Sequence, residues 1–216
     1  MVAVLRQHYQ IVDFVIPNHA YSAGTVFALS GDAIYMDYYS RLGPIDPQVE
    51  SMRGRTVSAL GYIEKYNSLV EKAANGDITD AEIQLLIMGF DQAELYSYEQ
   101  ARDSSVASLE EWLVKYKFKN WDRTATQGIK VTEEMKKERA KKIGSDSNDT
   151  ERWHSHGFGI SMEVLRNDLN LQIDDFGGDA DKSSSIKAYH ELLSDYMEKR
   201  GSDGVIQVVG EYRSYV

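Results

Sequence analysis

The chain has 216 residues, with 24 Lys and Arg against 34 Asp and Glu. Its net charge of −10 argues against a nucleic-acid partner, because the neutralisation of phosphates needs clustered basic side chains. A hydrophobic content of 42% and an aromatic content of 11% are typical of a globular domain with one sizeable core. The lack of cysteine excludes a disulfide framework, a thiol nucleophile and thiolate metal sites.

Residues 1–48 are predicted to form a strand, a helix, a second strand and a loop. The apolar run Ile11–Ile16 favours a strand that stops at Pro17, and the small residues of Ser22–Leu29 favour a helix. Asp32–Met36 favours the second strand. Apolar runs of this kind suit a parallel sheet that is buried on both faces.

Residues 49–144 are predicted to form a helical region, because apolar residues recur there at three- and four-residue spacing. The pair Asn75-Gly76 predicts the end of the first helix, and Thr79 with Glu82 predicts a capping box that begins the next one. Ser108 with Glu111 is predicted to cap a helix that begins before Trp112, and Thr132 is predicted to cap a highly charged helix to about Ile143, followed by a loop at 144–150.

Residues 145–216 are predicted to complete the core. A helix is expected from Ser161 to Leu169, followed by a polar, glycine-rich stretch at 174–185 that predicts a mobile loop. The last elements are a predicted helix at Ile186–Lys199 and a predicted strand at Val205–Val209.

Ser22 is the candidate nucleophile. A serine at a strand-to-helix turn is held exposed, close to the unpaired N–H groups of the first helical turn, and these groups and the helix dipole favour developing negative charge. Gly24 leaves room for a substrate or an oxyanion to approach the main chain. The simpler alternative is that Ser22 caps the helix, since serine is among the best residues at that position.

Four segments carry a resemblance to a known family. They are Ser22-Ala23-Gly24-Thr25, Asp32–Met36, Leu42-Gly43-Pro44-Ile45-Asp46-Pro47-Gln48 and Trp153-His154-Ser155-His156. Together they resemble the Clp-fold and signal-peptide-peptidase-A serine proteases, above all the branch called serine dehydrogenase proteinases (SDH family). The resemblance implies an α/β fold of the Clp/crotonase type, a partial parallel sheet flanked by helices, with a large helical insertion and a C-terminal helical segment. Members normally have further strands and a glycine-rich loop upstream, so the chain resembles an N-terminally truncated member.

The resemblance also suggests the general base. At the loop where the Clp pattern has its histidine, this chain reads Gly43–Pro47, so that base is absent. The peptidase-A branch uses a lysine on the following helix, where Lys65 is a candidate, with a solvated helical residue as the alternative. His156 matches the histidine of the family's Trp-x-x-His segment and is the preferred base; its alternative is a structural histidine packed against Trp153.

Oxyanion and substrate contacts are expected from Ala23 and Gly24, and the resemblance includes Asp46, which either orients a partner or holds its proline-flanked loop. No cofactor is expected. His154 and His156 are spaced like a metal-binding pair, with Asp146 or Asp149 as a third ligand, but two ligands without a defined third do not make a metal site, and none is predicted.

The sequence therefore predicts a serine endopeptidase that hydrolyses peptide bonds through an acyl-enzyme on Ser22, with polypeptide substrates and a homo-oligomeric assembly. The alternative is a non-catalytic or truncated Clp-like assembly module, and a third, weaker possibility is crotonase-type acyl-CoA chemistry. No apolar run approaches the roughly 20 residues of a membrane span, and no signal-peptide apolar region is present at the N-terminus, so a cytoplasmic location is expected.

Overall fold

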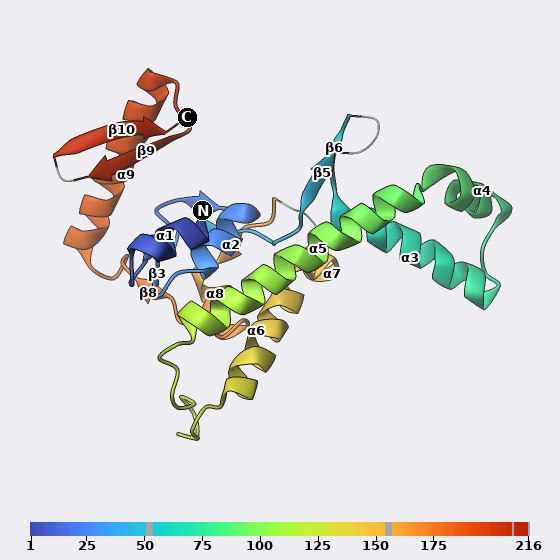
Figure 1. Cartoon of the computed structure of the whole chain (residues 1–216), viewed down its shortest axis with the longest axis horizontal. Helices are drawn as coiled ribbons and strands as arrows, with labels where there is room; N and C mark the ends of the chain where they lie inside the picture. Colours follow the sequence, from blue (N-terminus) through green and yellow to red (C-terminus); the bar gives the residue numbers. More distant parts are fainter. Residues whose placement is uncertain (51–53, 154–156, 209, 216) are drawn as a thin grey trace.

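A computed structural model describes residues 1–50, 54–153, 157–208 and 210–215. Figure 1 shows a central part of short strands and helices, with one arm on each side of it. One arm contains α3 (Ala59–Asn75) and α4 (Asp80–Gly89), and the other contains α9 (Ala180–Arg200) with a C-terminal hairpin. Strands and helices alternate in the central part, which confirms the predicted α/β class.

The N-terminal region follows the predicted order of elements, with shorter strands. It contains α1 (Val2–His8), β1 (Phe14–Val15), β2 (His19–Ala20), α2 (Ala23–Leu29), β3 (Ile34–Met36) and β4 (Arg41–Leu42). Of the predicted strand Ile11–Ile16, only Phe14 and Val15 are paired with a neighbouring strand, and a strand extends only as far as such pairing does.

Two small sheets form the central part. In one sheet β3 lies between β1 and β8 (Asp174–Asp175), and both pairs are parallel, with Phe14 opposite Ile34 and Tyr35 opposite Asp174. In the other, β4 lies between its parallel neighbour β2 and the antiparallel β7 (Ile160–Ser161). The predicted parallel pairing is confirmed, and strands from residues 160–175 lie beside strands from residues 14–42.

The middle of the chain is helical, but it begins with a hairpin that the sequence did not predict. The hairpin consists of β5 (Gln48–Glu50) and β6 (Thr56–Ser58), and the helices after α4 are α5 (Gln92–Trp112), the π-helix η1 (Leu113–Lys117), α6 (Glu133–Ser147) and the short α7 (Thr150–Trp153). Three predicted helix ends are confirmed: Gly76 is a left-handed C-cap, Thr79 and Glu82 form the capping box, and Thr132 caps α6. The cap predicted at Ser108 is wrong, because α5 continues without a break from Gln92 to Trp112, and the predicted loop at 144–150 is shorter, because α6 ends at Ser147 and α7 begins at Thr150.

The prediction of an irregular stretch at 174–185 is wrong. Its first two residues form β8, and α9 already begins at Ala180, six residues before the predicted helix. The Asp179 side chain accepts a hydrogen bond from the Lys182 N–H and caps this helix. Polar composition was misleading here because the first turns of α9 are largely exposed. Before β8 lies α8 (Met162–Asn167), and after α9 come β9 (Gly204–Val208) and β10 (Glu211–Tyr215).

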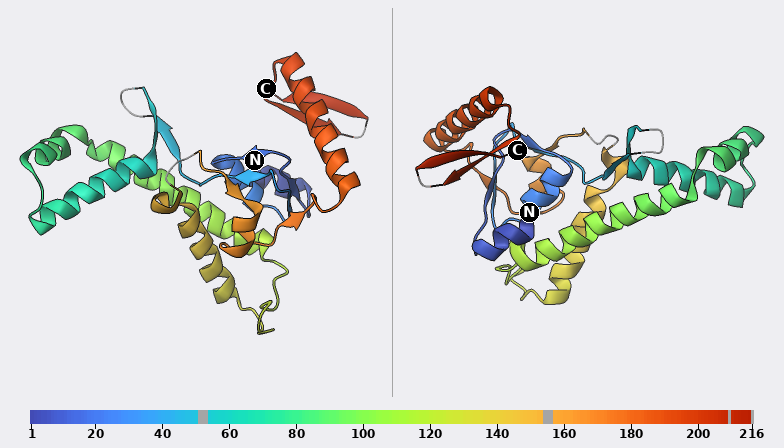
Figure 2. Two further views of the ribbon diagram at one scale, coloured as in Figure 1. Left: turned by 180° about the vertical axis from the view of Figure 1, so that it is seen from behind. Right: turned by 45° about the horizontal axis from the view of Figure 1, so that its top comes forward.

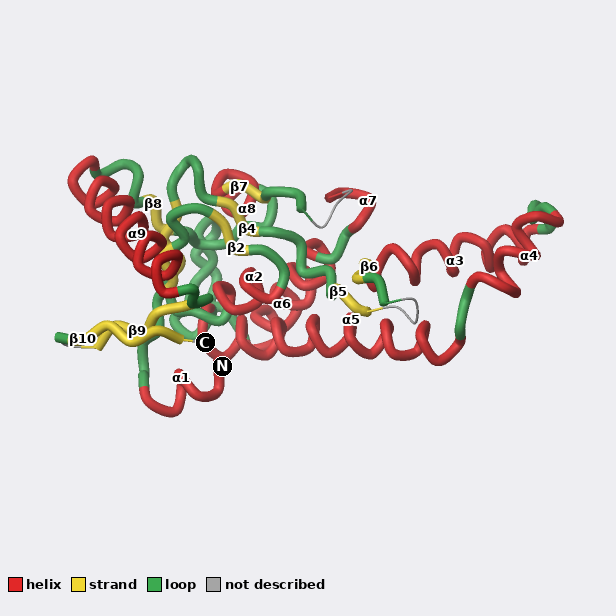
Figure 3. The backbone as a smooth tube through the Cα atoms, turned by 90° about the horizontal axis from the view of Figure 1, so that it is seen from above, coloured by secondary structure: helices red, strands yellow, loops and turns green. Residues whose placement is uncertain are grey.

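The main core draws on all three parts of the chain. It includes Leu29 of α2, Ile34 of β3, Leu109 of α5, Ile143 of α6 and Leu165 of α8, each at most 1% exposed. Figures 2 and 3 show α5 running from this core out to the α3–α4 arm. Within the described ranges, no helix is both long and apolar enough to cross a membrane.

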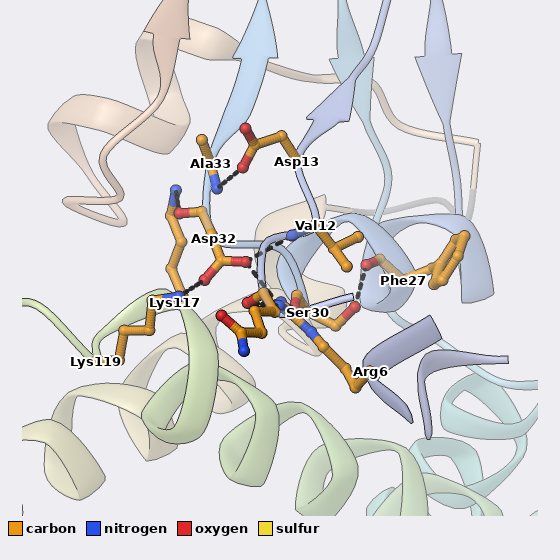
Figure 4. A network of polar contacts seen from close by, with 10 residues as sticks. Arg6, Val12, Asp13, Phe27, Ser30, Asp32, Ala33, Lys117 and Lys119 are labelled. Atoms are coloured by element: carbon orange, nitrogen blue, oxygen red, sulfur yellow. Dashed lines mark hydrogen bonds and ion pairs between the residues drawn. The ribbon is translucent and has the colours of Figure 1, made fainter. Parts of the chain in front are cut away.

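A polar network around Asp32 fixes the turn between α2 and β3 (Figure 4). Its carboxylate forms ion pairs with Arg6 and Lys119 and accepts a hydrogen bond from the Val12 N–H at 2.8 Å. Lys117 of the π-helix donates to the Asp32 carbonyl oxygen at 3.3 Å, and burial lowers the pKa of Lys117. The network ties α1, the approach to β1 and the end of the π-helix to one turn, which holds the far end of α2 in place.

Burial alone would raise the pKa of Asp32, but the hydrogen bonds to its carboxylate, led by that of Lys119, outweigh burial and hold this pKa below its ordinary value. The Asp32 side chain is only 11% exposed. Its charge is therefore compensated inside the fold, which links folding stability to the ionisation of Asp32.

Candidate active site

Ser22 has a strained backbone. Its φ of 53° and ψ of −118° lie outside the regions that L-residues favour, and only one other non-glycine residue in the described ranges, Asn170, has a positive φ. Such a conformation costs on the order of 1–3 kcal/mol and is typical of a serine presented on a strand-to-helix turn. Ser22 occupies the N-cap position of α2, yet its side chain makes no capping hydrogen bond. The hydroxyl therefore does not perform the capping role that was the simpler interpretation.

The N–H groups of Ala23 and Gly24 are expected to bind an oxyanion, but that of Gly24 already donates a hydrogen bond within the chain. The Gly24 N–H donates to the Tyr21 carbonyl oxygen at 2.9 Å, so it is not an available oxyanion donor. The Ala23 N–H has no acceptor among the described residues, and it belongs to the first helical turn, where donors are unpaired and the dipole favours negative charge. A Cβ on Gly24 would lie 3.3 Å from the Ala20 Cβ, so Gly24 serves the close packing of α2 on β2.

Thr25 clamps the serine turn to the loop after β4. Its buried Oγ1 lies 2.8 Å from the Ala20 carbonyl oxygen, 2.9 Å from the Gly43 carbonyl oxygen and 3.0 Å from the Gly43 nitrogen, from which it accepts a hydrogen bond. Gly43 also packs directly on Tyr21, since a Cβ there would come within 2.5 Å of the Tyr21 ring. Together, these contacts hold the main chain of the turn on which Ser22 lies in one conformation. Sequence reasoning missed Thr25, although it is the last residue of the Ser-Ala-Gly-Thr motif.

The topology brings three segments to one end of the β2–β4–β7 sheet. The serine turn leaves β2 there, the Gly43 loop leaves the parallel β4 there, and the antiparallel β7 begins there. The chain that leads into β7 is held on both sides of residues 154–156. Trp153 is buried, its Nε1 donates to the Asp146 carbonyl oxygen at 2.7 Å, and its ring centroid lies 5.4 Å from that of Phe158. His156, the preferred base, lies outside the described residues.

Lys65 lies on α3, and Asp46 lies at the start of that helix. Lys65 is exposed on α3, and Figures 1 and 2 show that α3 extends away from α2 into an arm. Asp46 is 4% exposed, and its Oδ1 accepts a hydrogen bond from the Leu60 N–H at 3.2 Å. This carboxylate therefore lies at the N-terminus of α3, where the helix dipole favours it, and it holds the loop to that helix.

A second buried polar cluster lies at the carboxyl ends of β1 and β3 and was not predicted. The Ser40 hydroxyl bonds to Asp37 and to the Ile16 carbonyl oxygen, and Lys187 of α9 lies 2.9 Å from the Asp37 carboxylate. Burial would raise the pKa of Asp37, but hydrogen bonds, led by that of Lys187, lower it. Ser40 is fully buried and therefore inaccessible as a nucleophile, so the cluster attaches the C-terminal arm to the sheet.

Comparison with known proteins gives a family match. The model of the ClpP-like SDH-type serine proteinases matches residues 1–128, a range that contains Ser22 and Lys65 and ends before His156. Among curated proteins, the chain is similar to two uncharacterized proteins of Methanocaldococcus jannaschii. It is 30% identical to MJ1495 over 99 residues, which are 46% of this chain and 32% of MJ1495. It is 42% identical to MJ0137 over 45 residues, which are 21% of this chain and 16% of MJ0137. The chain thus spans about a third or less of each relative's length. No solved structure matches.

Proposed function

The chain belongs to the family of ClpP-like SDH-type serine proteinases, and on this premise we propose that it is a serine endopeptidase that hydrolyses peptide bonds through an acyl-enzyme on Ser22. The observation that carries the proposal is the backbone of Ser22, which is strained at φ 53° while its hydroxyl makes no capping bond. A strained residue persists only where its surroundings enforce it, and such residues cluster at active sites. Here Thr25 and the Gly43 loop provide that enforcement.

In the proposed reaction, the Ser22 Oγ attacks the carbonyl carbon of the scissile peptide bond while a base takes its proton. The oxyanion accepts a hydrogen bond from the Ala23 N–H, and one such donor is typically worth about 2.7–4 kcal/mol of barrier lowering. The base then returns the proton to the leaving amine. Water attacks the ester in the second half and regenerates the hydroxyl. The Ala23 N–H supplies one donor, and a second one is required from another part of the protein.

His156 is proposed as the base in preference to Lys65. In the sequence, His156 lies between Trp153, whose ring centroid is 5.4 Å from that of Phe158, and β7, which begins at the end of the sheet where Ser22 lies. Lys65 is exposed on the α3 arm, which leads away from α2. An imidazole also titrates close to neutral pH, which suits general-base catalysis.

Hydrolysis of an unfolded polypeptide tests the proposal. We expect the purified protein to cleave fluorescein-labelled, dephosphorylated β-casein, with loss of cleavage in Ser22→Ala and a fall of at least about 100-fold in His156→Ala. Lys65→Ala is the matched control and should retain activity. Cleavage that survives Ser22→Ala, or that depends on Lys65 and not on His156, would contradict these assignments.

A homo-oligomeric assembly, expected for the endopeptidase and for the alternative non-catalytic assembly module alike, is supported by the exposed apolar side chains of α4. This helix buries none of its residues within the chain, and Ile87 and Met88 are 72% and 82% exposed. Large exposed apolar groups mark interaction surfaces. We therefore propose that α4 contacts a second copy of the chain in a homo-oligomer. Light scattering should report a multimer that dissociates in the Ile87→Lys, Met88→Lys double variant, whereas a monomeric wild-type protein would refute this contact.

A further inference from the structure

A groove lies between α3, α5 and the end of α6. Its volume is about 390 Å³, within the roughly 300–1,000 Å³ typical of ligand pockets, and it is open to solvent. Leu60 and Ile63 of α3 line one side, Arg102 and Val106 of α5 line another, and Asn148 lies where α6 ends. The groove therefore combines apolar groups with a few polar ones, as peptide-binding sites do.

Asn148 has an unusual side chain. Its Oδ1 and Nδ2 are both shielded from solvent, and neither has a hydrogen-bond partner within the described ranges. Most buried polar atoms in native proteins are paired, so an amide with neither atom paired needs an explanation. The Asn148 main chain is fixed, because its N–H donates to the Ser145 carbonyl oxygen at 3.1 Å. Rotation of the side chain alone can therefore present the amide to the groove.

An asparagine amide presents a donor and an acceptor side by side. The main chain of an extended peptide presents an N–H and a C=O in the same way, so one asparagine can pair with both groups. Such pairing is independent of the peptide's sequence. In the groove, Arg102 forms an ion pair with Asp103 at 2.8 Å, while Glu64 and Asp149 add negative charge. The groove thus favours a polypeptide main chain and disfavours acidic side chains.

The groove is connected to the serine turn by a short piece of main chain. Gly43 donates a hydrogen bond to the Ala20 carbonyl oxygen, two residues before Ser22. Ile45 donates to the Ser147 carbonyl oxygen at 3.2 Å, and Asp46 contacts Leu60, so both lie against the groove's walls. Gly43 and Asp46 are three residues apart and therefore at most about 11 Å from each other. An extended peptide rises about 3.3 Å per residue and covers that distance in three or four residues.

We propose that this groove binds the main chain of the polypeptide substrate several residues from the scissile bond, with the Asn148 amide pairing with one peptide unit. The inference rests on the proposed function and adds a substrate subsite to it. It also accounts for the unpaired amide: Asn148 has no partner among the described residues because its partner is the substrate.

Binding without catalysis tests this inference. All variants carry Ser22→Ala, and the probe is dephosphorylated β-casein, which is unfolded and contains no cysteine. Because the chain has no cysteine of its own, one introduced thiol can be followed by maleimide labelling. Ser145→Cys places the thiol in the groove, and Ser104→Cys places it at an exposed position of α5 that does not line the groove. We expect casein to slow labelling of the first at least about fivefold and to leave the second unchanged.

Asn148→Ala should weaken casein binding about tenfold, as expected for the loss of two hydrogen bonds. Asn75→Ala, at the exposed end of α3, is the matched control and should bind normally. Urea unfolding should show Asn148→Ala to be at least as stable as its parent, because the substitution removes two buried, unpaired polar atoms. A destabilised Asn148→Ala protein would indicate a structural role and contradict the inference.

The other outcomes are equally decisive. Equal protection of both thiols, unchanged affinity in Asn148→Ala, or no binding of casein would each overturn the subsite. If the protected groove is found in a protein whose wild type never cleaves casein, the proposed function fails while the binding site remains. If cleavage occurs and Ser145→Cys is not protected, only the subsite is wrong.

Discussion

Removal of the Thr25 hydroxyl tests whether the clamp holds the nucleophile turn. Thr25→Val keeps the shape of a buried side chain that is 2% exposed and removes only the Oγ1 that contacts Ala20 and Gly43. The Ala20 carbonyl oxygen and the Gly43 N–H still bond to each other at 3.1 Å. The Gly43 carbonyl oxygen loses the Thr25 hydroxyl and has no other donor among the described residues.

The expected loss of stability follows from the Gly43 carbonyl oxygen, the buried acceptor that Thr25→Val leaves unpaired. Leaving it unpaired costs about 1–3 kcal/mol of unfolding free energy. For a chain of this size, about 2–4 °C is lost per kcal/mol, so the melting temperature should fall by about 2–12 °C. The turn also loses the contacts that hold Ser22 at φ 53°, so its reactivity toward a serine-directed probe should fall as well.

Differential scanning calorimetry and the rate of fluorophosphonate labelling measure these two effects. Thr25→Ser is the control: it retains the hydroxyl and loses a buried methyl group, worth about 1 kcal/mol, so it should be slightly destabilised and label normally. If Thr25→Val melts and labels like the wild type, the clamp does not determine the turn and the reasoning fails.

Three further predictions concern single sites. Ser22→Gly should abolish labelling yet raise the unfolding free energy by about 1 kcal/mol relative to Ser22→Ala in urea titrations, because glycine adopts a positive φ without strain; equal stability of the two variants would argue against strain. Asp32 has a lowered pKa, so its stabilisation is complete above the unfolded-state value near 4 and is lost as the pH falls through the folded-state value. Asp32→Asn should therefore cost about 1–3 kcal/mol of unfolding free energy at pH 7, because it removes a hydrogen-bonded charge, and it should flatten the acid dependence of urea unfolding below about pH 5; an unchanged profile would show that other carboxylates cause that dependence. Gly43→Ala should lower the melting temperature by several degrees, because its Cβ would lie 2.5 Å from the Tyr21 ring, and normal melting would show that the ring moves freely.

Local signals in the sequence were enough to predict several elements. Pro17 and the small residues after Ser22 predict a strand-to-helix turn, and the structure has one. The capping box of Thr79 and Glu82 and the left-handed Gly76 were predicted because their hydrogen bonds join residues within one helical turn.

Non-local interactions account for the misses. Thr25 and Gly43 are 18 residues apart, and no local pattern connects them. Of the two roles that the sequence leaves open for Asp46, the loop-holding one depends on Leu60, 14 residues further on, which no local pattern connects to it. The polar residues at the start of α9 predict a loop, whereas in the structure the Asp179 side chain caps a helix there. The role of Ser22 depended on its side chain making no capping bond, which only the three-dimensional structure reveals.

Fluorophosphonate labelling of the purified protein, measured by intact mass and located by peptide mapping, tests most directly whether Ser22 is an activated nucleophile. We expect a single adduct on Ser22 and none in Ser22→Ala. A folded protein that takes up no label, or a label that persists in Ser22→Ala, would contradict this expectation.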